Sequence, residues 1–152
     1  MSPFVIDKMR VLAVDPGEKR LGIALSDPSG TIANPLTVLK HESRLIDAAS
    51  IAQTARENQA GLIIIGATYD DEGELTPQGR RAARLADVIR TQTDIPVTLW
   101  DEHSSTQAAR SARIGMGVSR KKRSGHLDDL AATVILQTYL DDPPGTPQEN
   151  KR

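Results

Sequence analysis

The chain has 152 residues, of which 38% are hydrophobic and 26% are charged, and these values are typical of one soluble globular domain. Its net charge is −1 and it has no cysteine, which excludes a polycationic protein, disulfides, thiolate zinc sites and cysteine nucleophiles. No apolar run approaches the roughly 20 residues that a membrane helix needs. The first ten residues also lack the apolar core of a signal peptide, so we expect a cytoplasmic protein with no membrane partner.

The first part of the chain predicts three strands. The segment "VLAVD" (11–15) is a short continuous apolar run, which is typical of a strand buried on both faces. A tight turn with Gly17 separates it from "LGIALSD" (21–27), so the two segments are a candidate hairpin. The segment "IANPLTVL" (32–39) predicts a third strand, and Pro35 places that strand at an edge or a bulge of the sheet.

Helices and strands alternate in the rest of the chain. Residues 43–59 predict a helix with Ser43 as its N-cap. The apolar residues at helical spacing in it are Leu45, Ile46, Ala49, Ala52 and Ala55. The elements expected after it are a strand at 61–66, a helix from Thr76 to about residue 92, a strand at 95–100, a helix from Ser104 to about Gly115 and a helix at 126–140. This order predicts an α/β fold with a mixed sheet and helices on its faces.

The predicted elements fill residues 9–141, which we expect to form a single domain. Residues 1–8 are a lead-in without a clear pattern, and residues 142–152 lack core-forming side chains. Both ends are therefore expected to be flexible termini.

Two of the predicted strands end on acidic residues. Asp15 ends the first strand, and Glu102 lies just past the end of the strand at 95–100. In open α/β sheets, functional groups gather at the carboxyl ends of the strands, so both acids are expected at one edge. The last helix offers Asp128 and Asp129. Helical spacing places Asp128 at the margin of the apolar face and Asp129 toward solvent. That expected face consists of Leu127, Leu130, Ala131, Val134 and Ile135.

The acids Asp15, Glu102 and Asp128 together predict a metal site. Clustered carboxylates repel one another unless a cation joins them. Mg²⁺ and Mn²⁺ prefer oxygen ligands and leave positions open for phosphate oxygens and for an activated water molecule. Each acid taken alone is more often a turn or capping residue, but three of them beside a basic loop favour a site that cleaves phosphodiesters.

Basic residues are concentrated near these acids. Between His103 and Leu127 there is no Asp or Glu. The basic loop in this stretch contains Arg120, Lys121, Lys122 and Arg123. Together with Lys19 and Arg20, these residues are expected to bind the phosphates of a nucleic acid without discriminating between sequences. His103 and His126 flank the predicted site, where a polar loop end or a helix cap is a more common role than a catalytic base.

Three segments resemble the YqgF-type family, whose members are described as nucleases of pre-16S rRNA and, earlier, as Holliday junction resolvases. They are "VDPGEKRLGIALSD", "LWDEHSSTQAA" and "VSRKKRSGHLDDLAATVILQTYLD", and the similarity covers residues 9–141. The resemblance implies an RNase H-like fold with a five-stranded mixed sheet of order 3-2-1-4-5, an antiparallel second strand and helices on both faces. It also implies that the family's three acids fall on Asp15, Glu102 and Asp128, and its basic pair on Lys19 and Arg20.

The sequence departs from the family pattern in two loops. It reads "GATYDDEGE" where the family commonly has a "GLP"-like turn followed by an Asn, and His103 stands where the family commonly has an Arg. Both departures concern loops around the expected substrate groove, so they bear on substrate contacts more than on metal binding.

The residues and the resemblance together predict a metal-dependent nuclease, a hydrolase of phosphodiester bonds. Its expected task is processing of the 5′ end of pre-16S rRNA in ribosome biogenesis, with Mg²⁺ or Mn²⁺ as cofactor and as a monomer or weak homodimer. One alternative is a Holliday junction resolvase acting on branched DNA, a role that favours a homodimer. Another is a non-catalytic RNA-binding assembly factor. A phosphotransferase is less favoured, because sugar kinases with a loop similar to "DPGEKRLG" need two such domains.

Overall fold

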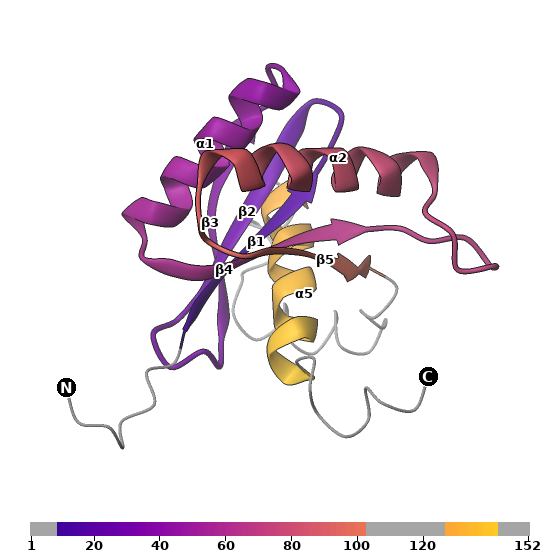
Figure 1. The fold of residues 1–152 in the computed structure, drawn as a ribbon. Helices are drawn as coiled ribbons and strands as arrows, with labels where there is room; N and C mark the ends of the chain where they lie inside the picture. The colour runs from indigo at the N-terminus through magenta and orange to yellow at the C-terminus, as the bar shows by residue number, and fades with distance from the viewer. Residues whose placement is uncertain (1–8, 103–126, 143–152) are drawn as a thin grey trace.

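The computed structural model describes residues 9–102 and 127–142 of the chain (Figure 1). The elements are β1 (Arg10–Pro16), β2 (Arg20–Ser26), β3 (Ala33–Lys40), α1 (Arg44–Glu57), β4 (Ala60–Ala67), α2 (Pro77–Gln92), β5 (Val97–Asp101) and α5 (Leu127–Asp141). The helix that the sequence predicts from Ser104 to about Gly115 lies outside the described residues. Every other predicted element is present.

The strands form one five-stranded sheet of order β3-β2-β1-β4-β5. β2 pairs antiparallel with β1 and β3, whereas β4 pairs parallel with β1 and β5. The predicted strand order and the antiparallel second strand are therefore confirmed. Ile23 pairs with Thr37 while Ala24 pairs with Pro35, so β3, an edge strand, carries an irregularity next to its proline, as the sequence predicts.

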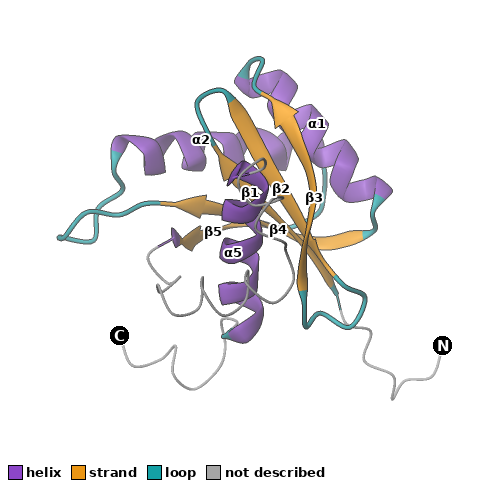
Figure 2. Cartoon of the chain, turned by 180° about the vertical axis from the view of Figure 1, so that it is seen from behind, coloured by secondary structure: helices purple, strands orange, loops and turns teal. Residues whose placement is uncertain are grey.

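Helices cover both faces of the sheet (Figures 1 and 2), which confirms the predicted fold class. Side chains alternate along each strand, so Leu12 and Val14 of β1 pack in the cluster that includes α1 and α2. Val11 and Ala13 of the same strand pack in the cluster that includes α5. The face under α1 and α2 is called the two-helix face below, and the opposite one the α5 face.

The start of α1 differs from the sequence prediction in the face that it buries. Ser43 is its N-cap as predicted, because its Oγ accepts a hydrogen bond from the Ile46 N–H at 3.2 Å. Leu45 and Ile46, however, are 61% and 52% exposed, and Ala49 is exposed too, so the prediction that these three face the core is wrong. The buried residues of α1 are Asp47, Ala48, Ile51, Ala52 and Ala55. Polar contacts of the Asp47 carboxylate with the preceding segment orient this side of the helix inward.

The packing face of α5 also differs from the prediction. Its residues in the cluster on the sheet are Ala132, Ile135 and Leu136, with Tyr139 and Leu140 packed against them. Of the face predicted from the sequence, this cluster contains only Ile135. Leu130 and Val134 are buried as well. The side chains of Asp128 and Asp129 lie outside the described residues, so the preference for Asp128 stays a prediction.

The helix α2 begins as the sequence predicts. The Thr76 hydroxyl accepts a hydrogen bond from the Gly79 N–H at 3.0 Å, and Pro77 occupies the first turn. Within the described ranges, no helix has the length and apolar character required to cross a membrane.

Candidate active site

Asp15 lies near the carboxyl end of β1, in the middle of the sheet. It is paired with Gly22 of β2, and the preceding residue, Val14, is paired with Ile65 of β4. Alternation along the strand directs Asp15 to the α5 face, because Val14 packs on the two-helix face. Asp15 is therefore beside Gly66 of β4, and neither neighbouring strand carries a side chain next to it on that face.

Glu102 follows directly after β5 and reaches back over β4. A Cβ atom built on Gly66 would lie 2.9 Å from the Glu102 Oε2 and 2.6 Å from the Ile135 Cδ1. The space that a side chain would occupy at Gly66 is thus shared by the Glu102 carboxylate and by α5. Strands β1 and β5 are two strand spacings apart, roughly 10 Å, and the long Glu102 side chain reduces that separation. The structure brings Asp15 and Glu102 to the same face of the sheet, on either side of β4.

The third predicted acid, Asp128, belongs to the first turn of α5. Figures 1 and 2 show the start of this helix toward the end of the sheet that carries the β1–β2 turn. The other end of the helix is fixed at the β2–β3 turn, where the Gln137 side chain accepts from the Ala33 N–H and donates to the Thr31 carbonyl, both at 3.0 Å. The side chain of Asp128 lies outside the described part of the chain. Among the described side chains, no group of three acids or histidines is arranged to hold a metal ion.

The turn after Asp15 places two predicted basic residues at the surface. Lys19 and Arg20 are exposed. Gly17 donates its N–H to the Arg20 carbonyl at 2.9 Å, and a Cβ on Gly17 would lie 2.5 Å from that oxygen. The glycine is therefore required for the close approach of backbone to backbone. The predicted contacts Arg120, Lys121, Lys122 and Arg123 lie outside the described residues, as do His103 and His126.

A basic surface around the β1–β2 turn and α2 is absent from the sequence prediction. Three hollows of the described surface share Glu18. The Lys and Arg residues that line them are Lys19, Arg20, Lys40, Arg44, Arg80, Arg81 and Arg84. The acids are Glu18 and Asp47. In the sequence, the arginines of α2 have the spacing of an ordinary solvated helix face. Only the fold brings them next to the turn that follows Asp15.

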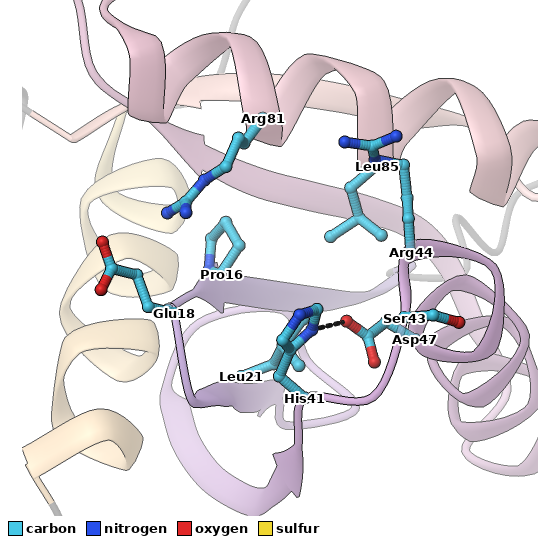
Figure 3. A pocket seen from close by; sticks show the side chains of 10 residues that line it. Pro16, Glu18, Leu21, His41, Ser43, Arg44, Asp47, Arg81 and Leu85 are labelled. Carbon is cyan, nitrogen blue, oxygen red and sulfur yellow. Dashed lines mark hydrogen bonds and ion pairs between the residues drawn. The ribbon is translucent and has the colours of Figure 1, made fainter.

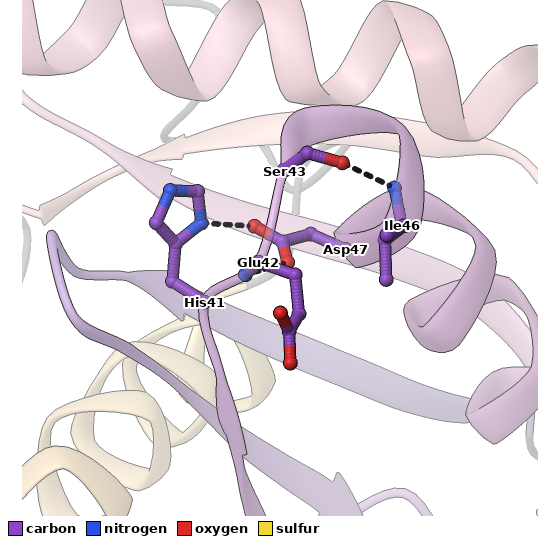
Figure 4. A network of polar contacts seen from close by, with 5 residues as sticks. All are labelled: His41, Glu42, Ser43, Ile46 and Asp47. Carbon is purple, nitrogen blue, oxygen red and sulfur yellow. Dashed lines mark hydrogen bonds and ion pairs between the residues drawn. The ribbon is translucent and has the colours of Figure 1, made fainter.

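One of these hollows, the arginine pocket, has a volume of about 310 Å³ (Figure 3). Its apolar lining consists of Pro16, Leu21 and Leu85, and its polar lining consists of Glu18, His41, Ser43, Arg44, Asp47 and Arg81. At its base, the buried Asp47 carboxylate is 2.5 Å from the His41 Nδ1 and accepts from the Glu42 N–H at 3.0 Å (Figure 4). Since a carboxylate only accepts, Nδ1 carries the proton and the imidazole is held in one orientation.

Two ionisable groups with shifted pKa values lie elsewhere. The hydrogen bond from the Ser29 hydroxyl, followed by those from the Ile32 and Thr31 N–H groups, holds the pKa of Asp27 well below its ordinary value. Burial raises the pKa of Tyr139, whose ring packs edge-on against Trp100 at a centroid distance of 5.1 Å. Asp27 stabilises the β2–β3 turn and Tyr139 packs in the core, so neither supplies a group to the acids at the carboxyl edge.

The family described as "RuvX: Holliday junction resolvase" matches residues 9–142. The chain belongs to this family. Two relatives named "Putative pre-16S rRNA nuclease" support the assignment. The protein of Thermoanaerobacter pseudethanolicus is 41% identical, over 88% of this chain and 96% of its own length. That of Caldanaerobacter subterraneus subsp. tengcongensis is 38% identical over the same shares. The resemblance derived from the sequence motifs is thereby confirmed, and so is the prediction of a nuclease as the class of enzyme.

Solved structures agree on the fold of this RuvX family member. T. thermophilus RuvC in complex with a Holliday junction substrate has a TM-score of 0.61 at 19% identity, covering 87% of this chain and 92% of that one. The Fowlpox virus resolvase in complex with Holliday junction DNA has a TM-score of 0.54 at 14% identity, covering 88% and 97%. At these identities the likeness concerns the fold, which is the RNase H-like architecture expected from the motifs.

Proposed function

We propose that this protein is a metal-dependent nuclease that processes the 5′ end of pre-16S rRNA. The observation that carries the proposal is the convergence of Asp15 and Glu102 on one face of the sheet. Glu102 occupies the space left by Gly66, immediately beside the strand position of Asp15. Two carboxylates close together on one face repel each other, and this repulsion favours binding of a divalent cation. The names of the relatives favour precursor rRNA as the substrate.

The donor set fits a hard divalent cation. Asp15 and Glu102 supply oxygen ligands, which Mg²⁺ and Mn²⁺ prefer. Asp128, in the first turn of the helix that packs on this face, is the third ligand in the proposal. When bound, the metal would lower the pKa of a water molecule and neutralise charge that develops on the phosphate.

The residues of the chain itself position the substrate and the ligands. The strands fix Asp15 and the start of Glu102, so few degrees of freedom remain to be frozen when the metal binds. Gly66 has no side chain, so the Glu102 carboxylate can lie over β4 beside the strand position of Asp15. The substrate would be bound through its phosphates, without discrimination between base sequences. The residues proposed for these contacts are Lys19, Arg20, Arg120, Lys121, Lys122 and Arg123.

A cleavage assay with Mg²⁺ or Mn²⁺ tests this proposal. Wild-type protein, Asp15→Asn, Glu102→Gln and Asp101→Asn would be incubated with end-labelled pre-16S rRNA and with a four-way DNA junction. Asp101 is the matched control, because it neighbours Glu102 but points, by strand alternation, to the opposite face. We expect metal-dependent cleavage of the RNA that is lost in the first two variants and retained in Asp101→Asn.

The same assay separates the alternatives. The family description favours a junction resolvase as the second candidate. Metal-dependent cleavage of the DNA junction but not of the RNA would establish that role, and a dimeric mass in sedimentation would support it. Binding of RNA without cleavage, unchanged by Asp15→Asn, would refute a nuclease and support an assembly factor.

A further inference from the structure

We propose that the arginine pocket binds a backbone phosphate of the nucleic-acid strand whose scissile bond lies at Asp15 and Glu102. This inference rests on the proposed nuclease function and adds a second contact point for the same substrate. The pocket opens on the two-helix face, so it lies across the sheet from the carboxylates.

The charges of the pocket favour an anion. Arg44 and Arg81 line it from α1 and α2, with the Arg81 side chain directed toward Glu18 and the Arg44 side chain beside Leu85 (Figure 3), and both are exposed. Within residues 9–102 and 127–142, neither guanidinium has a hydrogen bond or ion pair in the protein. Guanidinium groups form paired hydrogen bonds with phosphate oxygens more readily than any other side chain. Two such groups from different helices define a site rather than a single surface charge.

The acidic residues of the pocket do not cancel these charges. Asp47 is 5% exposed, and its carboxylate is engaged by His41 and by the Glu42 N–H. Because Nδ1 of His41 faces Asp47, its Nε2 is the ring atom left for a ligand. Glu18 is exposed at the lip of the pocket, and no ion pair joins it to Arg81 in Figure 3. Further positive charge lies in the two neighbouring hollows that share Glu18 with the pocket, from Lys19, Lys40, Arg80 and Arg84.

The position of the pocket indicates a nucleic-acid strand as the source of the phosphate. Pro16 and Gly17, which line it, are the two residues after Asp15. Gly17 is therefore at most roughly 7 Å along the chain from the catalytic acid. A strand that is held at Asp15 and crosses the β1–β2 turn over Lys19 and Arg20 reaches the pocket within a few nucleotides.

Binding measurements without metal test the inference, because no cleavage is then required. The affinity of a fluorescent single-stranded RNA would be measured by anisotropy over a range of salt concentrations. The variants are Arg44→Ala, Arg81→Ala, the double variant and Arg56→Ala. Arg56 is the matched control, since it is an exposed arginine at the other end of α1. Its removal changes the net charge by the same amount.

We expect each pocket variant to weaken RNA binding about tenfold, as for a lost charge-assisted hydrogen bond. The slope of log affinity against log salt should fall by about 0.7 per arginine and about 1.4 in the double variant. Arg56→Ala should bind like wild type. Circular dichroism melting should be unchanged in the Arg44 and Arg81 variants and at most slightly lowered in Arg56→Ala, which loses a 3.3 Å hydrogen bond to the Gln92 carbonyl. Inorganic phosphate should compete with RNA for the wild-type protein more strongly than for the double variant.

Two results would overturn the inference: wild-type affinity in the double variant, or an equal loss in Arg56→Ala. Phosphate competition that is the same in wild type and in the double variant would also refute it. Failure of the nuclease proposal is a separate result. It would show as no metal-dependent cleavage in wild type, whatever the arginine variants do to RNA binding.

Discussion

The two faces of the sheet carry opposite charges at the same edge. On the α5 face, Glu102 lies over Gly66, beside the strand position of Asp15. On the two-helix face, Arg44 and Arg81 line a pocket whose lining begins at Pro16, the residue after Asp15. Arginines placed directly against the carboxylates would pair with them and compete with a metal ion. The thickness of the sheet keeps the two sets apart.

This division assigns different tasks to the two faces. The α5 face would supply the chemistry, which depends on a bound cation and on the placement of two carboxylates. The two-helix face would supply affinity, which depends on charge and weakens with salt. Variants on one face should therefore change turnover, and variants on the other should change affinity.

Asp15→Asn should have the largest effect. Loss of a metal ligand removes several kcal/mol of transition-state stabilisation, so we expect cleavage to fall by about 10³-fold or more. RNA affinity in the absence of metal should stay within about twofold of wild type, and the free energy of unfolding should change by at most ~0.5 kcal/mol. Single-turnover cleavage, anisotropy and urea unfolding measure the three quantities. A collapse of stability would instead identify Asp15 as a structural residue.

Gly66→Ala should act on the same face through Glu102. The new Cβ would meet the Glu102 Oε2 at 2.9 Å and the Ile135 Cδ1 at 2.6 Å. Displacement of a metal-ligating carboxylate typically costs about 10- to 100-fold in activity, and overpacking costs about 1–3 kcal/mol of stability. Cleavage rates and urea unfolding curves would be compared with those of wild type.

The Glu102→Gln background supplies the decisive control for Gly66→Ala. If the alanine acts through the carboxylate, it should lower activity in the wild-type background and have little further effect in Glu102→Gln. Equal losses in both backgrounds would mean that Gly66 supports only the packing of α5. Gly73→Ala, at a φ of 82° with no atom near its Cβ position, should reduce stability without reducing cleavage.

The central strands could be predicted from the sequence because their signal is local. The runs at β1 and β4 are continuous and apolar, and such runs are typical of strands buried on both faces. The importance of Gly66 could not be predicted in this way. It depends on the parallel register of Val14 with Ile65 and on the reach of Glu102 from β5, both of which arise from pairing between distant segments.

The errors at α1 and α5 have different physical causes. Apolar spacing suggested an inward face at Leu45 and Ile46, but the contacts of Asp47 with His41 and Glu42 orient the helix differently. Apolar residues are buried around much of α5, so no single apolar stripe reveals its packing face. The arginines of α2 were missed because they become a surface only when α2 lies beside α1 and the β1–β2 turn.

Asp47→Ala tests the two-helix face with a moderate effect. Removal of this buried carboxylate leaves the Glu42 N–H and the His41 Nδ1 without their acceptor, which should cost about 1–3 kcal/mol of unfolding free energy. His41 and the start of α1 then lose their fixed position, so RNA affinity should fall while turnover at saturating RNA is retained. Urea unfolding, anisotropy and steady-state cleavage measure these effects.

Ser43→Ala is the matched control for Asp47→Ala. It removes the N-cap of the same helix, at a cost of about 1 kcal/mol, but leaves the Asp47–His41 contact in place. RNA affinity should therefore be lower in Asp47→Ala than in Ser43→Ala. Equal affinities in the two variants would show that the histidine contact serves only the stability of α1.

Asp27→Asn should have the smallest effect, because Asp27 lies at the opposite end of the sheet from both charged sets. The ionised carboxylate accepts from the Ser29 Oγ at 2.6 Å and from the Thr31 and Ile32 N–H groups at 2.9 Å. Its pKa is lower in the folded than in the unfolded chain, so its contribution to stability is fully present above the unfolded value of about 4. That contribution is lost as the pH falls further, toward the folded pKa.

Wild type should therefore exceed Asp27→Asn in stability by a margin that is greatest at neutral pH and narrows below about pH 4. Urea unfolding of both proteins between pH 7 and pH 3 measures this margin, and a constant margin would contradict the role assigned to the carboxylate. Cleavage and RNA affinity should be the same in both proteins at pH 7. A loss of cleavage or of RNA affinity in Asp27→Asn would show that the β2–β3 turn also contributes to function, which would contradict the assignment of function to the opposite end of the sheet alone.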